Sequence, residues 1–271
     1  MKILIINLPA SIERLHFQQK QFSKLGLVFE ILPAVSIINI SEQQYQQQAF
    51  GWQRPLRKVE LACFLSHKTA WEKVVELNQP CLILEDDAVL AKNSREVLEN
   101  IEQQQLPDVD LINLEVRSRK KIISKQPKVR LLNGQFKLFE LYQERTGTGG
   151  YMIYPSGAKK LLTRLQNVSP APADAFIFSD YSLNSLQIEP ALLIQEDQMV
   201  AYGLTDLLQL DSIIGRSEHH KPVYRNLSEK ILFKQRRLMG QLAMAIRYIQ
   251  VMPKASKRFI ALNKKDFDWV K

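Results

Sequence analysis

The sequence is poor in cysteine and glycine and has no long apolar run. Two cysteines, Cys63 and Cys81, are too few for a four-ligand zinc site or a disulfide framework. Both lie in apolar sequence, which favours buried thiols in a reducing compartment. Ten glycines exclude a collagen-like chain, and no apolar stretch approaches the roughly 20 residues that span a bilayer. The opening MKILIINLPAS predicts a strand rather than a signal peptide, because Asn7 interrupts its short apolar run. We therefore expect a globular cytoplasmic protein.

Positive charge is concentrated in the last fifth of the chain. Residues 221–271 hold 13 of the 37 Lys and Arg but only three of the 28 acids, so they account for the net charge of +9. Residues 227–250 also show helical periodicity, and Asn226 followed by Glu229 resembles a helix-capping pair. The pattern predicts a near-neutral domain over residues 1–220 and a basic amphipathic helical extension over residues 221–271. Such an extension is expected to meet an anionic partner.

Strand and helix patterns alternate at the start of the chain. Residues 2–8 predict a buried strand, residues 11–24 a helix that ends at Gly26, and residues 27–35 a second strand. This β–α–β order is typical of an α/β fold with parallel strands. The other expected elements are a helix over residues 59–78, strands over 81–84, 110–114 and 151–154, a loop or surface helix over 43–48, and a solvated loop over 117–128.

Three consecutive carboxylates, Glu85, Asp86 and Asp87, follow the predicted strand 81–84. Strand alternation places the side chains of Glu85 and Asp87 on one side of the strand. Asp86 would face the opposite side, or a turn would release it from this alternation. Ligands of open α/β sheets bind at the carboxyl ends of strands. A divalent cation would relieve the repulsion between the carboxylates, and oxygen ligands suit Mg²⁺ or Mn²⁺. The alternative is a solvated turn.

Three further features have both a structural and a functional interpretation. His67 lies one helical turn after Cys63, but no orienting third group supports nucleophilic catalysis, and a half-buried histidine is the alternative. The segment 146–150 has neither spacing of a phosphate-binding loop, so its glycines predict a turn or a close approach of the backbone to a neighbouring segment. Asp174 follows Pro-Ala-Pro-Ala, which either fixes a carboxylate in place or provides a helix N-cap.

Taken in order, four blocks of the chain resemble glycosyltransferase family 25, the bacterial lipooligosaccharide-core glycosyltransferases. These blocks are Ile6-Asn7-Leu8 with Ser11, Glu13 and Arg14; Glu60, Cys63, Ser66, His67 and Trp71; Ile83 to Ala88; and Tyr151-Met152-Ile153 with residues 157–162 and 172–174. Together they span about residues 2–215. Pro9 and Ala10 replace frequently charged positions, and Val59 and Ala62 replace frequent glycines, which affects the details of donor binding.

The resemblance implies a GT-A-like nucleotide-sugar fold, in which helices flank a mixed, mainly parallel sheet, and an inverting reaction. Mn²⁺ or Mg²⁺ would be held by Asp87 and Asp86 against the donor diphosphate. The general base would be Asp174, with Glu196 or Asp197 as alternatives. The implied donor-binding residues are Asn7, Leu8, Arg14, His67, Glu85 and Asp86, and the implied acceptor-side residues are Thr148, Gly149 and Tyr151.

The resemblance also implies the partners. The donor would be UDP-galactose, or UDP-glucose as the second choice, and the acceptor a lipooligosaccharide glycan. That acceptor is anchored in the cytoplasmic leaflet of the inner membrane, so the basic helix would hold the enzyme peripherally on this anionic surface. Alternatively, the helix packs on the domain with a solvated cationic face.

Other functions remain open at this level. A metal-dependent phosphohydrolase or nucleotidyltransferase would also place carboxylates after a strand, and a non-catalytic protein could bind sugar nucleotides or glycans without turnover. Nucleic-acid binding is disfavoured, because the basic segment lacks interleaved aromatic residues and no known module is present. We therefore expect no specific nucleic-acid partner.

Overall fold

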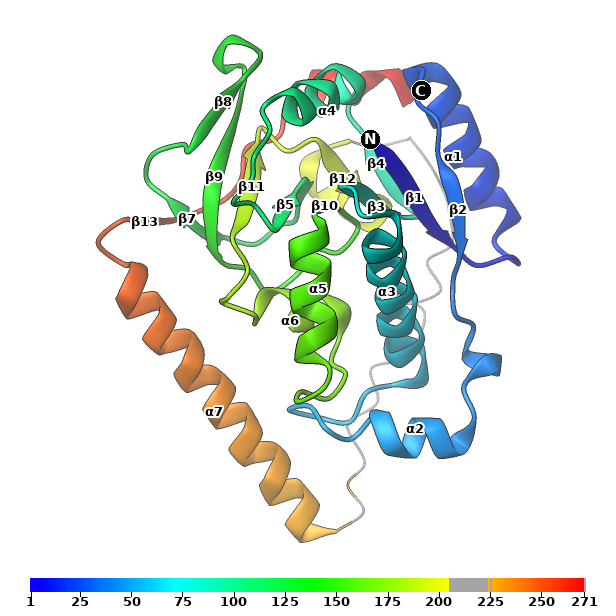
Figure 1. The fold of residues 1–271 in the computed structure, drawn as a ribbon, viewed down its shortest axis with the longest axis vertical. Coiled ribbons are helices and arrows are strands. Elements are labelled where there is room, and N and C mark those ends of the chain that lie inside the picture. Colours follow the sequence, from blue (N-terminus) through cyan, green and yellow to red (C-terminus); the bar gives the residue numbers. More distant parts are fainter. Residues whose placement is uncertain (205–223, 225, 271) are drawn as a thin grey trace.

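The computed structural model describes residues 1–204, 224 and 226–270 (Figure 1). The described α-helices are α1 (Ile12–Leu25), α2 (Glu42–Gln48), α3 (Lys58–Leu77), α4 (Ser94–Gln103), α5 (Pro155–Arg164), α6 (Ala173–Phe178) and α7 (Leu227–Val251). The described strands are β1 (Lys2–Asn7), β2 (Glu30–Pro33), β3 (Cys81–Glu85), β4 (Ala88–Leu90), β5 (Leu111–Asn113), β6 (Glu115–Val116), β7 (Lys121–Ser124), β8 (Val129–Leu131), β9 (Phe136–Gln143), β10 (Gly150–Ile153), β11 (Ser185–Glu189), β12 (Leu193–Gln195) and β13 (Ala255–Arg258). None of these helices has both the length and the apolar character needed to cross a bilayer.

A mixed sheet forms the centre of the molecule, which confirms the expected α/β class. Ten of the described strands make this sheet in the order β13-β7-β9-β11-β5-β10-β3-β1-β2, with β8 paired to β9. β1 is parallel to β2 and β3, and β5 is parallel to β11. Because β10 runs antiparallel between β3 and β5, all five of those strands point in one direction. A second sheet, β4-β12-β6, begins just beyond the carboxyl ends of β3 and β5.

Helix α3 is fixed by packing against α5 and α6 (Figure 1). The rings of Phe64 and Trp71 on α3 lie 5.0 and 5.8 Å, between centroids, from the ring of Phe176 on α6. At the start of α3, Glu60 accepts a hydrogen bond from the backbone N–H of Arg57 at 2.9 Å. Aromatic packing and this N-terminal contact hold α3 rigidly. Its side chains can therefore be presented accurately to the ends of the strands.

The chain after α7 returns to the domain. β13 pairs with β7 at the edge of the sheet, and Phe267 is fully buried in the main hydrophobic core. The indole N–H of Trp269 donates to the carbonyl of Leu90 at 3.2 Å. The predicted boundary between residues 220 and 221 lies outside the described residues, and the division into two units stays a prediction. The residues that follow α7 share the core of the first unit.

Most of the expected elements are present, with one clear correction. The helix expected over 59–78 is α3, the cap at Asn226 accepts from Glu229 N–H at 2.8 Å, and Gly26 ends α1 with φ of 62°. The prediction of a solvated loop over 117–128 was wrong, because this stretch contains β7. Lys121 is buried there, and its ammonium donates to the Gln187 side-chain oxygen at 2.7 Å. Lys121 was counted as part of a solvated basic loop, although its charge is buried and paired within β7.

Candidate active site

The acidic triplet forms the turn between β3 and β4. Glu85 ends β3, Asp86 and Asp87 make the turn, and Ala88 starts β4. The side-chain amide of Gln18 on α1 donates to the backbone carbonyls of Asp86 and Ala88, both at 2.9 Å. These bonds satisfy buried backbone acceptors. The turn is thereby fixed to α1.

Asp86 is held by the end of β1 and the start of α1. One carboxylate oxygen accepts from the Asn7 amide at 2.9 Å, and the other accepts from the Arg14 guanidinium at 2.7 Å. Burial raises the pKa of Asp86, although Arg14 and Asn7 act in the opposite direction. Both oxygens are thus already engaged. Asn7 ends β1 and Arg14 lies in the first turn of α1, and together they orient this carboxylate.

Glu85 points to the other side, where α3 and the segment before β10 meet. Its carboxylate accepts from the Thr148 hydroxyl at 2.8 Å and from His67 Nε2 at 3.2 Å. His67 Nδ1 in turn lies 2.9 Å from the Tyr151 hydroxyl. Burial acts to raise the pKa of Glu85, but the contacts with His67 and Thr148 outweigh it, so the pKa is lowered. Glu85 is therefore held as an anion.

Tyr151 holds His67 in place on the side of the ring away from Glu85. Its ring is fully buried, and its hydroxyl accepts from the Trp71 indole N–H at 2.9 Å. The hydroxyl then donates to His67 Nδ1, so His67 donates to Glu85 through Nε2–H. The acceptor-side role predicted for Tyr151 does not fit this position, because a fully buried hydroxyl cannot contact an acceptor.

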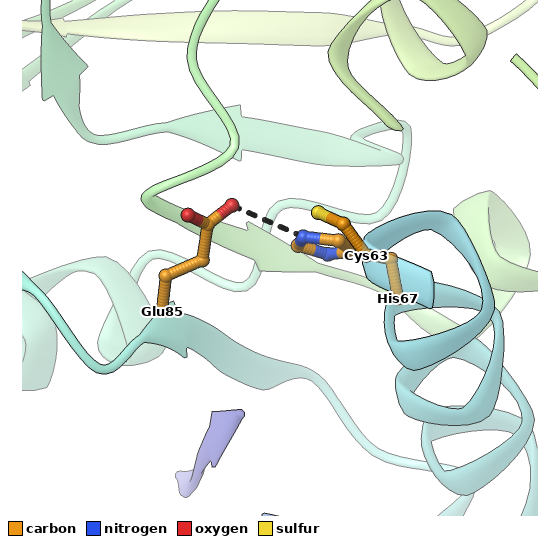
Figure 2. Close-up of side chains that lie close together, drawn as sticks. All are labelled: Cys63, His67 and Glu85. Carbon is orange, nitrogen blue, oxygen red and sulfur yellow. Dashed lines mark hydrogen bonds and ion pairs between the residues drawn. The ribbon is translucent and has the colours of Figure 1, made fainter. Parts of the chain in front are cut away.

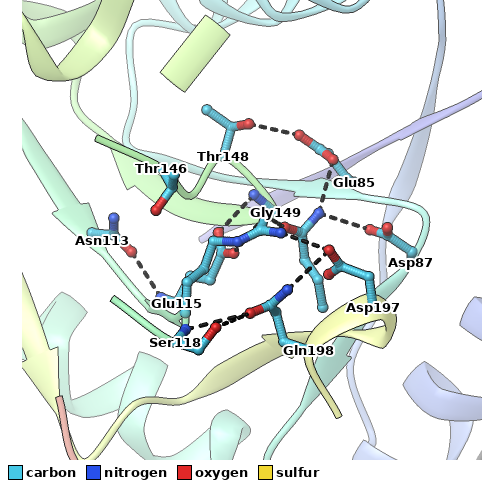
Figure 3. Close-up of polar contacts among 12 residues, drawn as sticks. Glu85, Asp87, Asn113, Glu115, Ser118, Thr146, Thr148, Gly149, Asp197 and Gln198 are labelled. Carbon is cyan, nitrogen blue, oxygen red and sulfur yellow. Dashed lines mark hydrogen bonds and ion pairs between the residues drawn. The ribbon is translucent and has the colours of Figure 1, made fainter. Parts of the chain in front are cut away.

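Asp87 lies on the same side as Glu85, as strand alternation predicted. The amide of Gln195, at the end of β12, donates to Glu85 at 3.0 Å and to Asp87 at 3.1 Å (Figure 3). Burial and the neighbouring Glu85 carboxylate raise the pKa of Asp87 to about 7. One side-chain amide therefore bridges two carboxylates that repel each other.

Gln195 is itself held by a polar network that extends away from the turn (Figure 3). Its oxygen accepts from Arg117, whose guanidinium also pairs with Asp197 at 2.6 Å. The backbone of Gly149 passes so close to Gln195 that an added Cβ would lie 2.4 Å from the Gln195 side chain. The N–H of Gly149 donates at 2.9 Å to Glu115. The glycine at position 149 thus serves close backbone approach, as the sequence indicated.

A cavity of about 320 Å³ lies in front of the acidic turn. Its apolar lining includes Ile6, Val35 and Ala62. Its charged lining consists of Arg14 and the acidic triplet. Leu8 and His67 also line it. A concave site with both apolar and charged lining fits a ligand that combines a flat ring with charged groups.

Two sets of residues are candidates for holding a metal ion. The ligand atoms of Cys63, His67 and Glu85 lie within 4.8 Å of one another (Figure 2). This set suits Mn²⁺ or Mg²⁺ poorly, since sulfur is a soft ligand and His67 Nε2 carries the proton given to Glu85. Burial also raises the pKa of the Cys63 thiol well above its usual value. The carboxylates of the turn fit better, because Asp87 is a half-buried oxygen ligand and a cation would relieve its repulsion with Glu85.

Asp174 lies in the first turn of α6, and the N-cap position is taken by Pro172. Its carboxylate accepts from the N–H of Ala175 at 2.6 Å. Burial raises the pKa of Asp174 to about 6; Glu85 and Glu144 act in the same direction and Arg117 opposes them. The alternatives Glu196 and Asp197 both face arginines: Glu196 lies 4.0 Å from Arg14, and Asp197 is bound by Arg117. Asp174 is thus the candidate best suited to accept a proton.

Residues 1–177 match the family described as "Glycosyltransferase family 25 (LPS biosynthesis protein)". The chain belongs to glycosyltransferase family 25. The family's lacto-N-neotetraose biosynthesis glycosyltransferase LgtE of Neisseria gonorrhoeae is 26% identical over 251 residues, which cover 88% of each chain. The lipooligosaccharide biosynthesis protein lic2B of Haemophilus influenzae is 24% identical, covering 72% of this chain and 76% of its own. A glycosyltransferase involved in glycosylation of the major capsid of PBCV-1 aligns with a TM-score of 0.40 and 11% identity, covering 72% of this chain and 93% of that chain.

As a member of glycosyltransferase family 25, the chain is a glycosyltransferase with relatives in lipooligosaccharide biosynthesis. Gln195, Arg117 and Gln18 are also parts of the site, although they were not predicted from the sequence. A signal for Gln195 was present: Leu193-Ile194-Gln195 is an apolar run followed by two acids, the same pattern as β3 and its turn. The long-range contacts of Gln18 and Arg117 left no comparable local signal.

Proposed function

We propose that the protein is an inverting hexosyltransferase with a GT-A-like site. It moves galactose, or glucose as the second choice, from a UDP-sugar to a saccharide acceptor of lipooligosaccharide. The observation that carries this proposal is the cavity that combines an apolar lining with Arg14 and the acidic turn. A uracil ring would pack on the apolar residues, and a diphosphate would lie beside Arg14 and a cation held by the carboxylates.

In this proposal Asp87 holds the divalent cation, and Asp86 stays bound to Asn7 and Arg14. When bound, Mn²⁺ or Mg²⁺ would neutralise negative charge on the diphosphate of the donor. Arg14 supplies a fixed positive charge at the same end of the cavity. Glu85 and His67 shape the wall where the sugar would lie, and Thr148 keeps Glu85 in place.

Asp174 is proposed as the general base. The acceptor hydroxyl oxygen bonds to the anomeric carbon while the bond from that carbon to the β-phosphate oxygen breaks. UDP leaves with the bonding electrons, and the hydroxyl proton passes to the Asp174 carboxylate. The pKa of about 6 leaves this carboxylate ionised at neutral pH yet more basic than an ordinary aspartate.

We also propose that α7 binds the anionic cytoplasmic surface of the bacterial inner membrane. One side of the helix exposes an apolar row that includes Leu238 (64% exposed), Leu242 and Ile249. Lys230, Lys234 and Arg237 follow the adjacent strip of the same helix. Each basic residue near an anionic membrane contributes about 1 kcal/mol, and apolar insertion adds to it.

The direct test is UDP release from the purified protein across a panel of UDP-sugars, with Mn²⁺ or with EDTA. Lactose- and glucose-terminated acceptors are present or omitted. We expect metal-dependent release from one hexose donor, stimulated by an acceptor, and a product of inverted anomeric configuration by NMR. An equal rate of UDP release with and without the acceptor would instead indicate a phosphohydrolase. Donor binding without release would indicate a binding protein.

A further inference from the structure

A second cavity, of about 730 Å³, lies between α7 and the body of the domain. Its walls come from α7, the segment 51–53, the end of β9, and α6 with the segment that follows it. It shares no lining residue with the cavity in front of the acidic turn. The two cavities are therefore formed by different parts of the described chain.

Helix α7 is tied across this second cavity at two points. Arg236 donates to the backbone carbonyl of Phe50 at 2.8 Å. Farther along α7, the carbonyl of Met244 accepts from the Gln143 amide at 2.5 Å. Between these points Gly240 lets the helix approach Gln53, whose amide nitrogen would lie 2.1 Å from an added Cβ. The cavity is therefore enclosed by the packing of α7 against the domain.

The lining combines aromatic rings with positive charge. Trp52, Phe178 and Tyr181 provide flat apolar surfaces of the kind that pack against apolar ring faces of a ligand. Arg145, Arg164 and Arg236 line the same space. The lining contains one carboxylate, Glu144, and it pairs with the buried ammonium of Lys121 at 2.7 Å. The uncompensated charge of the cavity is therefore positive.

The cavity also reaches the proposed base. Ala175, which follows Asp174 in α6, is part of its lining. The carboxylate of Asp174 is within electrostatic reach of Glu144 in this cavity and of Glu85 in the first one. A hydroxyl group presented from the second cavity would thus lie beside the proposed base, which could accept its proton.

We propose that this second cavity binds the acceptor, a saccharide that carries an anionic group, either phosphate or carboxylate. Arg145 and Arg236 recognise the anionic group, and the aromatic rings pack against the sugar rings. The proposal rests on the proposed transferase function, and it adds the place of the acceptor and its charge. Arg145 is the better residue to vary, since its side chain is exposed and Arg236 also ties α7 in place.

The test measures binding of a defined probe by calorimetry, without donor. The probe is the water-soluble oligosaccharide obtained by deacylating lipooligosaccharide. Arg145→Gln removes the charge, and Ala243→Phe fills the cavity from α7. Arg130→Gln on β8 and Ala245→Phe, two residues along α7, are matched controls that do not line the cavity. Loss of one charge-assisted hydrogen bond is expected to weaken binding about tenfold or more.

We expect Arg145→Gln and Ala243→Phe to weaken probe binding, with both controls and UDP binding unchanged. Dephosphorylated and carboxyl-reduced probes then show which anionic group is recognised, because only one treatment should reproduce the loss. Equal affinity of wild type, Arg145→Gln and Ala243→Phe would overturn the proposal, as would full affinity for a probe given both treatments. Probe binding without any sugar transfer would instead contradict the transferase function and leave the binding site supported.

Discussion

Glu85 and Asp87 share a single hydrogen-bond donor, the amide of Gln195. If Asp87 holds the cation, Gln195 is a positioning residue that keeps both carboxylates aimed at the same point. Gln195→Ala should raise the Mn²⁺ concentration needed for half-maximal activity by about tenfold, the lower range for loss of a partner that orients metal ligands. Saturating Mn²⁺ should restore most of kcat. Gln198→Ala is the control, since Gln198 bonds to Ser118 and Asp197 and not to the carboxylates of the turn (Figure 3). An unchanged Mn²⁺ requirement would remove this role.

Asp174 sets the expected pH dependence at the residue scale. A base must be ionised to accept a proton, so kcat/KM should fall as pH drops through about 6, the raised pKa of Asp174. Asp174→Asn should lower kcat by about 10²–10⁴-fold and remove this acidic limb. Asp108→Asn, an exposed aspartate, serves as the control. If kcat/KM of Asp174→Asn still falls at acidic pH as in wild type, another group is the base.

At the scale of elements, two faces of α7 have different proposed roles. Its outer apolar row should bind membranes, so the pair Leu238→Glu and Leu242→Glu should reduce sedimentation with vesicles of anionic lipid. Val28→Glu and Val200→Glu place the same charge on exposed positions elsewhere, and they should sediment like wild type. Activity toward a water-soluble acceptor should be unchanged in both pairs. Equal sedimentation of the two pairs would mean that α7 is not the anchor.

The elements that sequence predicts well are those whose signals are local. The alternation in β3 placed Glu85 and Asp87 together, and the three- and four-residue spacing over 59–78 predicted α3, the helix that carries His67. β7 was missed because its buried Lys121 depends on Gln187 and Glu144, which are distant in sequence. The two acids after Gln195 marked the end of a strand, but the role of Gln195 exists only once β12 pairs with β4. Burial of polar groups through tertiary contacts is invisible to local patterns.

At the scale of the whole molecule, the segment after α7 is part of the core. Phe267→Ala should therefore lower the free energy of unfolding by about 3–5 kcal/mol, the usual cost of removing a fully buried phenylalanine ring. Phe259→Ala, whose ring is 53% exposed, should cost about 1 kcal/mol or less. Urea unfolding followed by circular dichroism measures both. Equal small effects would show that the C-terminal segment is not integrated with the domain.

The same scale connects the two cavities and the membrane. If the outer face of α7 lies on lipid as proposed, a membrane-anchored acceptor would reach the second cavity along the inner face of the same helix. The acceptor would then meet the donor at Asp174. This arrangement explains how one helix could serve both attachment and acceptor binding.

In the proposed function, the cavity in front of the acidic turn holds a UDP-sugar through Asp87 and a divalent cation. The most direct measurement is UDP release by wild type, Asp87→Asn and the exposed control Asp108→Asn, with Mn²⁺ titrated and acceptor present. We predict that wild type and Asp108→Asn release UDP in a Mn²⁺-dependent manner and that Asp87→Asn falls by about a hundredfold or more, since it loses a charged metal ligand. Asp87→Asn turning over like wild type at every Mn²⁺ concentration would contradict the account.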